Sequence, residues 1–409
     1  MTKPSPSIRK VRDYATNSLG LQAYLRRPGD GRKRPQIRAT DLVWAQVSCQ
    51  ILQRTSFHDV ERLVRSGVAR ELTLNRVFSD DSLAYFNDRL DPQPTRDALA
   101  AVAKRAKRNK VFRRQPRVGL AIDGTGAGRS HAKSKVCKYC RPFKDDKGNV
   151  IGHKHELVMA SVVDVGLSLP VDVEPYGEGD CELNGGQRLL ARITEALGPR
   201  FAEYVVADAK FAAAPFLNEA VQLGLHAVVR LKDNVPTLFD RATVRFNSRA
   251  PDTTIDHHGE PVEIWDDETF VPWEGLKWKF VRVLRYRYRS PKGEIVDAYW
   301  LTNYSQQSIG SMALFRLAKS RWEIENEGFN EAKTRHGMEH ICHHNANALL
   351  VGWLLLLLGL VIERLYRHCF LHRGSHPRIT AADLAWRLLI ALARPPTRAG
   401  PEPVTAASA

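Results

Sequence analysis

Three acidic residues lie at positions where an α/β fold would bring their carboxylates to one edge of its sheet. Asp123 and Asp208 each end a short apolar run, and Glu325 lies in a late helical segment. The carboxyl ends of the strands in an open α/β sheet form the edge where ligands bind. Taken singly, either Asp could instead cap a turn or the next helix. The three together are the first candidates for a functional site.

Three converging carboxylates suit metal-dependent cleavage of a phosphodiester. Such cleavage uses two divalent ions about 3.5–4 Å apart, one beside the attacking oxygen and one beside the leaving oxygen. Carboxylate oxygens are the ligands that Mg²⁺ or Mn²⁺ prefers. We therefore expect Asp123, Asp208 and Glu325 to hold two Mg²⁺ (or Mn²⁺) ions in one active site.

The elements that must position these acids indicate an α/β fold. Short apolar runs bounded by turn residues predict strands at 118–123, 156–165, 167–173, 204–208 and 226–231. Amphipathic patterns predict helices at 184–197 and 215–223. Adjacent strands followed by alternating helices and strands indicate a mixed sheet with flanking helices. We expect this catalytic core to cover 118–234 and 298–370.

The remaining segments have different patterns. Residues 235–297 predict a β-rich insertion with no helix between its strands, and 309–336 predict a long helical segment that carries Glu325. The uninterrupted apolar run 348–362 is shorter than the roughly 18–20 residues of a membrane span and predicts a buried core helix. In the C-terminal segment 371–409 we expect a disordered tail.

The positive charge of this chain of 409 residues is concentrated at one end. The formal net charge is +16, and residues 1–117 contribute +14 because they hold 25 Lys and Arg against 11 Asp and Glu. Amphipathic patterns predict an all-helical domain there. Because an excess of basic residues favours a polyanionic partner, we expect residues 1–117 to bind double-stranded DNA.

Two groups of basic residues are the candidates for binding DNA phosphates. Eight of the fourteen residues in 104–117 are basic and none is acidic; its candidates are Lys104, Arg105, Lys107, Arg108, Arg113 and Arg114. In the insertion, Arg285 and Arg287 alternate with tyrosines, which places the arginines on one face of a strand. These two arginines either bind DNA or belong to the solvated face of a half-buried strand.

The sequence as a whole resembles the DDE transposases of bacterial insertion sequences, whose catalytic domain is RNase H-like. The resemblance is carried by Ile-Asp123-Gly-Thr-Gly, by Val-Val-Ala-Asp208-Ala-Lys-Phe and by Arg321-Trp-Glu-Ile-Glu325 followed by Phe329. The third motif is similar to the Tyr-Arg-Glu-Lys signature of a subgroup with a β insertion. Its spacing stacks Arg321 and Glu325 on one helix face.

Two positions of the signature differ in this chain. Ala318 takes the place of the Tyr and Ala332 that of the Lys, while Lys333 is one position late. Glu323 is a rival for the third acid, and the spacing from Arg321 favours Glu325.

The resemblance implies a DNA transposase that cuts at terminal inverted repeats and frees a 3′-OH. That hydroxyl would then be joined to target DNA by transesterification, with Arg321 and Lys333 as phosphate ligands. It also implies excision through a hairpin intermediate and a homodimer in a synaptic complex. With neither a secretory signal nor a membrane span in the sequence, we expect a cytoplasmic, nucleoid-associated protein with no membrane partner.

A second metal site is suggested by Cys137 and Cys140, which are followed by His153 and His155. The Cys-x-x-Cys spacing suits zinc. The His-x-His spacing is shorter than usual for zinc and is also that of two residues on one strand face. The sequence leaves open a structural zinc site made by these four residues, free thiols in a loop, and a basic segment at 131–141 that contacts DNA.

Two other functions remain open. A strand followed by Asp123-Gly-Thr-Gly also occurs in actin-like phosphotransferases, but a second Gly-rich phosphate loop is not found and the basic N-terminal region would be unexplained. The other alternative is a transposase-derived DNA-binding protein that has lost its activity. The presence of all three acids argues against it.

Overall fold

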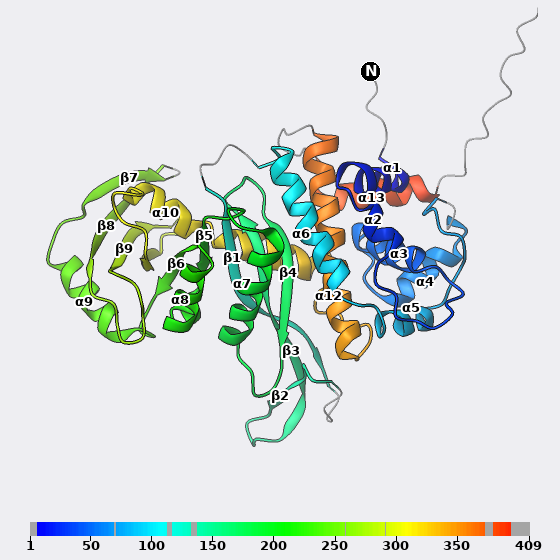
Figure 1. Cartoon of the computed structure of the whole chain (residues 1–409), viewed down its shortest axis with the longest axis horizontal. Helices are drawn as coiled ribbons and strands as arrows, with labels where there is room; N and C mark the ends of the chain where they lie inside the picture. Colours follow the sequence, from blue (N-terminus) through cyan, green and yellow to red (C-terminus); the bar gives the residue numbers. More distant parts are fainter. Residues whose placement is uncertain are drawn as a thin grey trace, which may run out of the picture.

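The fold is described from a computed structural model, which covers residues 6–68, 71–112, 117–131, 137–257, 259–290, 292–372 and 379–393. One mixed sheet of ten strands runs through the molecule in the order β2-β3-β1-β5-β6-β10-β9-β8-β7, and β4 also pairs with β3. Figure 1 shows the N-terminal helices at one end of this sheet and β7 to β9 at the other. The sheet therefore connects the two ends of the protein.

The strands that precede the acids form the centre of the sheet. They are β1 (Gly119–Ser130), β3 (Val150–Val163), β4 (Leu169–Tyr176), β5 (Tyr204–Ala207) and β6 (His226–Leu231), with the short β2 (Arg141–Lys144) beside the outer end of β3. The β1–β3 and β3–β4 pairs are antiparallel, whereas β1–β5 and β5–β6 are parallel. The order β4-β3-β1-β5-β6, with only β3 reversed, is that of an RNase H-like sheet, so the predicted fold class is confirmed.

The insertion continues the same sheet. Its strands are β7 (Thr253–His257), β8 (Glu260–Phe270), β9 (Val281–Arg289) and β10 (Ile295–Thr302), and β10 pairs antiparallel with β6. The β-rich composition was correctly interpreted, but the helix α9 (Pro236–Asn247) that precedes these strands was missed. Its buried residues Leu238, Ala242 and Phe246 recur every four residues, which is the helical signal.

Helices cover both faces of the central strands. Gly185 of α7 (Glu182–Leu197) lies against Val158, whereas Gly328 of the π-helical segment η4 (Ile324–Phe329) lies against Met159. Because neighbouring residues of a strand point to opposite faces, α7 and η4 lie on opposite sides of the sheet. The other helices of these layers are α8 (Ala214–Gln222), which follows the 3₁₀ turn η3 (Ala209–Phe211), α10 (Ser311–Lys319) and α11 (Asn330–Thr334).

The N-terminal region is helical, as predicted, and shares its core with the rest of the chain. Its elements are α1 (Ile8–Asp13), η1 (Tyr14–Ser18), α2 (Gln22–Arg26), α3 (Ala39–Ile51), α4 (Phe57–Arg65), α5 (Asp80–Asn87) and α6 (Gln93–Arg108). The apolar helix α12 (Ala346–Leu365) packs against α3, α5, α6 and β4. Figure 1 shows α6 and α12 side by side between the sheet and the N-terminal helices.

Helix α12 confirms the prediction of a buried core helix. Together with η5 (Tyr366–Leu371) it is long and apolar enough to cross a membrane, but 94% of its most apolar stretch is buried inside the protein. The following helix α13 (Ala381–Ala393) was missed. For segment 371–409, only the composition of its last residues was interpreted. The predicted disordered tail, 394–409, lies outside the described residues.

An ion-pair network on β4 joins the N-terminal helices to the sheet. Asp172 is buried and binds Arg96 of α6 at 3.1 Å and Arg192 of α7 at 2.7 Å. Each arginine also donates to the carbonyl oxygen of Val173. Since two helices from different parts of the chain share one carboxylate, the N-terminal helices are held in a defined position relative to the central strands.

Gly119→Ala is expected to lower the free energy of unfolding by about 1–3 kcal/mol. A Cβ at this position would lie 2.3 Å from Cζ of Tyr204, whose ring is buried and whose hydroxyl lies 3.0 Å from Oγ of Ser320. Gly126→Ala, in the same strand, has no atom within 4 Å of the new Cβ and serves as the control. Urea unfolding midpoints measure the difference, and equal midpoints for the two variants would contradict it.

Candidate active site

Asp123 and Asp208 lie side by side because the strands that lead to them are paired in parallel. Ile122 of β1 is paired with Ala207 of β5, and each acid is the next residue along the chain. Both therefore leave this pair of strands at the same edge. The predicted turn after Asp123 is wrong, since β1 continues to Ser130 and remains paired with β3. A strand in place of a glycine loop also argues against the actin-like phosphotransferase.

Glu325 approaches Asp123 from the helical layer on one face of the sheet. Asp123 is paired with Met159, which contacts Gly328 of η4, so the Asp123 side chain points to the η4 face. Nη1 of Arg321 donates to Oδ2 of Asp123 at 2.9 Å and to Oε1 of Glu325 at 2.7 Å. The guanidinium thus bridges two of the three predicted acids and confirms that Arg321 and Glu325 share a helix face.

Glu323, the rival third acid, points to another part of the sheet. Its carboxylate accepts the backbone N–H of Asp164 at 3.2 and 3.1 Å, at the turn between β3 and β4. Burial raises the pKa of Glu323 to about 7. The structure therefore brings Glu325, and not Glu323, to Asp123.

The surroundings of the Asp123 carboxyl raise its pKa, so that a bound cation could replace its proton. Burial raises its pKa to about 7, and the nearby carboxylates of Glu325 and Asp208 act in the same direction. Arg321 and the backbone N–H of Gly124, which donates to Oδ1 at 2.9 Å, oppose this shift. A positive ion beside these carboxylates would relieve their repulsion and lower the pKa.

The donor set fits a hard divalent ion such as Mg²⁺, because three carboxylates supply only oxygen ligands. Arg321 already shows that Asp123 and Glu325 converge on one positive group. Within the described residues, however, the three acids do not form a group whose ligand atoms all lie within 4.8 Å of one another. The Arg321 guanidinium occupies the space between Asp123 and Glu325.

The π-helical geometry of η4 bears on Lys333, which is one position later than the family signature. In a regular α-helix, a residue eight positions after Glu325 would be about 80° away around the axis. The backbone N–H of Asn330 bonds to the Glu325 carbonyl five residues earlier, so η4 takes up an extra residue. The extra residue turns Lys333 back toward the helix face that carries Glu325. The Nζ atom of Lys333 lies 3.1 Å from Oε1 of Glu339.

Two further charged side chains lie at the edge of the site and were missed. Lys210, two residues after Asp208, bonds to Glu182 at 2.8 Å. The carboxyl of Glu182 lies against Gly124, where a Cβ would be only 2.3 Å from its Cδ. The bond to Glu182 and the nearby Asp123 and Asp208 raise the pKa of Lys210. The only signal in the sequence was the position of Lys210 just after the second acid.

Arg230 of β6 is a third missed charged side chain near the acids, and the second cation. Burial lowers the pKa of its guanidinium, while the charge of Asp208 acts in the opposite direction. The guanidinium lies over the ring of Trp300 at 5.7 Å. In the sequence, Arg230 is a single charged residue within an apolar strand pattern. That pattern contains no signal that would place Arg230 at the site.

The basic residues of α6, which were predicted to bind phosphates, in part have partners within the chain. Lys104 donates to the Ala196 carbonyl at the end of α7, Arg105 to the Ser18 carbonyl, and Lys107 to the Phe201 carbonyl. These three cations thus hold α6 to neighbouring segments, because unpaired carbonyls at helix ends and turns attract them. Arg108 is exposed at the end of α6, and Arg113 and Arg114 lie outside the described residues.

The alternating arginines of β9 differ from one another. Arg285 is buried, bonds to Asp297 at 2.9 and 2.6 Å, and lies over the rings of Trp265 and Tyr299. These contacts make it a structural residue, which corrects the proposed DNA contact. Arg287 is exposed and pairs with Glu263 at 3.0 Å, which leaves a solvated face available.

The four candidate zinc ligands are only partly brought together. Sγ of Cys137, Sγ of Cys140 and Nε2 of His155 form one compact group. His153 is buried on the same strand, β3, but does not belong to that group.

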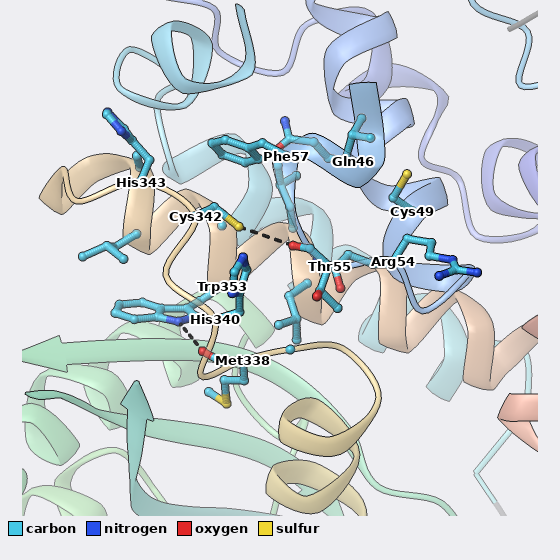
Figure 2. A pocket seen from close by; sticks show the side chains of 18 residues that line it. Gln46, Cys49, Arg54, Thr55, Phe57, Met338, His340, Cys342, His343 and Trp353 are labelled. Atoms are coloured by element: carbon cyan, nitrogen blue, oxygen red, sulfur yellow. Dashed lines mark hydrogen bonds between the residues drawn. The ribbon is translucent and has the colours of Figure 1, made fainter. Parts of the chain in front are cut away.

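A pocket between α3, α4 and α12 lies away from the three acids (Figure 2). One wall is the segment 337–343, which follows the helical segment with Glu325. There the Cys342 thiol donates to the Thr55 carbonyl at 3.3 Å, and the Trp353 indole donates to the Met338 carbonyl at 3.2 Å. None of the candidate catalytic residues lines this pocket.

Comparison with known proteins identifies the family of this chain. Residues 114–362 match the family described as Transposase DDE domain. Among solved structures, the chain is similar to a cryo-EM structure of the piggyBac transposase synaptic complex with hairpin DNA, with 13% sequence identity, a TM-score of 0.45, and coverage of 94% of this chain and 77% of that chain. No curated protein matches the chain. Since the family match spans more than half of the sequence and includes all three acids, the chain belongs to the family of transposases with a DDE domain.

Proposed function

We propose that this transposase cleaves DNA at the ends of a transposon and joins the freed 3′-OH to target DNA. The observation that carries the proposal is that Asp123 and Asp208 leave paired strands at one edge of the sheet, where the buried Arg321 guanidinium joins Asp123 to Glu325. Such an arrangement supplies oxygen ligands for divalent ions together with a cation for phosphate. When bound, Mg²⁺ or Mn²⁺ ions would activate the attacking oxygen and stabilise the leaving oxygen.

The side chains of the site have separate roles in this proposal. Asp123, Asp208 and Glu325 hold the ions. Arg321 keeps two of these carboxylates neutralised until DNA arrives, and its planar guanidinium then binds a phosphate near the scissile bond. Lys210, next to Asp208, is placed to bind the neighbouring phosphate.

The proposed reaction has two chemical steps, a hydrolysis of one phosphodiester bond and then a transesterification that exchanges one phosphodiester bond for another. First, a water oxygen forms a bond to phosphorus and loses a proton to solvent. The bond from phosphorus to the 3′ oxygen breaks, and that oxygen takes up a proton from solvent, which gives a 3′-OH and a 5′-phosphate. In the second step, the freed 3′ oxygen loses its proton and bonds to a phosphorus of the target. The target's own 3′ oxygen leaves and takes up a proton. The second step needs no external energy source because the number of phosphodiester bonds is unchanged.

The partners follow from the same proposal. Double-stranded DNA would be bound twice, as the terminal inverted repeats and as the target, and two protomers would hold the paired ends. Exposed Arg108 and Arg287 remain available for phosphate contacts, whereas Lys104, Arg105 and Lys107 bind backbone carbonyls. We infer a cytoplasmic, nucleoid-associated location from the DNA substrate.

Cleavage of a duplex that carries the terminal inverted repeat of its own element tests the proposed function. The full chain with Mg²⁺ is expected to nick the duplex at the repeat boundary, and Asp208→Ala is expected to bind the duplex without nicking it. Asp240→Ala, which removes an exposed acid on α9, is the control and should cut like the wild type. Binding without Mg²⁺-dependent nicking by the wild type would instead support the inactive DNA-binding protein.

A further inference from the structure

A second group of metal-ligating atoms lies outside the acidic site. The two thiols of the Cys-x-x-Cys segment, Cys137 Sγ and Cys140 Sγ, are 3.5 Å apart. Nε2 of His155, which projects from β3, lies 3.5 Å from the first sulfur and 3.6 Å from the second. Three soft or borderline ligands from two segments thus form a nearly equilateral triangle.

The size of this triangle matches one face of a tetrahedral zinc site. With Zn–S bonds of about 2.3 Å and Zn–N bonds of about 2.0 Å, the edges of the tetrahedron are about 3.5–3.8 Å. A disulfide would instead need the two sulfurs about 2.05 Å apart. The spacing of the two thiols therefore favours a shared metal ion over a covalent bond between them.

The local fold holds the triangle in place. The backbone N–H of Cys140 bonds to the Cys137 carbonyl at 3.1 Å, which closes the turn between the two thiols. Gly177, just after β4, supports this turn, because a Cβ there would be 2.0 Å from the Lys138 carbonyl oxygen. Cys140 and His155 are fully buried and Cys137 is half-buried. The ligands are therefore enclosed rather than displayed on a loose loop.

The candidate for a fourth ligand is His344, in the segment between α11 and α12, which like His153 lies outside the compact group of three. Its ring lies 5.1 Å from the ring of His155, centroid to centroid. Nε2 of His344 is buried and has no hydrogen-bond partner among the described residues. A buried polar atom without a partner costs about 1–3 kcal/mol, which a metal bond would remove.

We propose that Cys137, Cys140, His155 and His344 bind one structural Zn²⁺ ion. The ion would tie together three segments: the turn that precedes β2, strand β3 of the central sheet, and the segment that joins the helix of Glu325 to α12. A site with four protein ligands leaves no open position, so it supports the fold and does no chemistry. The proposal does not depend on the acidic site or on transposition.

Metal content and a cobalt spectrum test the proposal on the full-length chain. The protein purified without chelators is expected to retain about one zinc per chain by elemental analysis. The Cys137→Ser, Cys140→Ser double variant is expected to retain at least tenfold less. Cys181→Ser, which changes an exposed cysteine outside the group, is the matched control and should retain zinc like the wild type. Apo protein reloaded with Co²⁺ should show the visible absorption of a tetrahedral cobalt thiolate.

Three results would overturn the proposal. They are wild-type protein that retains no zinc after dialysis against added zinc, equal zinc content in the double variant, and a Cys137–Cys140 disulfide in the freshly purified chain. The cobalt spectrum uses folded wild-type protein, so it decides the matter even where the double variant does not fold.

The fourth ligand has its own test. His344→Ala is expected to weaken zinc binding at least tenfold and to shift the cobalt spectrum, while His153→Ala should change neither by more than twofold. The opposite pattern would show that His153 completes the site and would overturn the assignment of His344.

Discussion

Asp123→Asn is expected to abolish DNA cleavage, with a loss of at least about 10³-fold in rate. The substitution keeps the size of the side chain and its position in β1 but removes the negative charge that lies between Arg321 and the neighbouring acids. Single-turnover nicking of a repeat-end duplex measures the loss. Glu323→Gln is the matched control, because this acid binds the Asp164 N–H instead, and it should cut within tenfold of the wild type. Cleavage by Asp123→Asn within tenfold of the wild type would contradict the site.

The same variant has a predictable effect on stability. The folded pKa of Asp123, about 7, is above the ordinary value of 3.8, so the folded protein holds this proton more tightly than the unfolded chain. The contribution of Asp123 to wild-type stability should therefore fall as pH rises from about 4 to 7, and the loss is complete above pH 7. Since Asn carries no charge, the metal-free variant should be more stable than the wild type at pH 8, by up to about 4 kcal/mol. The two should be alike near pH 4.

Melting temperatures with and without Mg²⁺ check this expectation. At pH 8, Mg²⁺ should raise the Tm of the wild type, because it binds the carboxylates of the folded state, and should leave Asp123→Asn unchanged. A variant that is less stable than the wild type at pH 8 would show that the Arg321 contact outweighs the burial of the charge.

Asp266→Ala is expected to destabilise the protein by about 3–5 kcal/mol. Arg282 of β9 and Asp266 of β8 form a buried pair with distances of 2.7 and 2.5 Å, and their side chains are 0% and 2% exposed. Without the carboxylate, the buried guanidinium would keep its charge with no acidic partner. Arg282 also binds the carbonyl oxygens of Ser305 and Ile309, just before α10, so the loss should spread toward Arg321.

Chemical unfolding of Asp266→Ala against Glu263→Ala isolates the effect of burial. Glu263 pairs with Arg287 across the same two strands, but both side chains are exposed, so its loss should cost less than about 1 kcal/mol. Similar losses for the two variants would show that the buried pair adds nothing to stability.

Local patterns in the sequence were sufficient to predict the main elements of the catalytic core. Apolar runs located the strands before Asp123 and Asp208, and the four-residue spacing of Arg321 and Glu325 predicted that they share a helix face, where they form an ion pair. These features depend on residues that are close in sequence, where periodicity and helix geometry give direct information. The strand pairing that makes the two Asp residues neighbours was an inference from fold class, which the observed register confirms.

The tertiary structure alone decided which polar groups meet. Choosing Glu325 over Glu323 depended on which face of η4 lies against β3, and the carbonyl partners of Lys104 and Lys107 come from residues about 90 positions away. The proposed zinc ligands are likewise brought together by tertiary packing, because the segment before α12 places the ring of His344 beside that of His155. The sequence contains the type and order of the side chains, and this information was sufficient to identify the three candidate acids of this transposase. Contacts between distant segments depend on how helices and strands pack, and that packing determines whether a basic residue can bind DNA or instead binds a carbonyl group of its own chain.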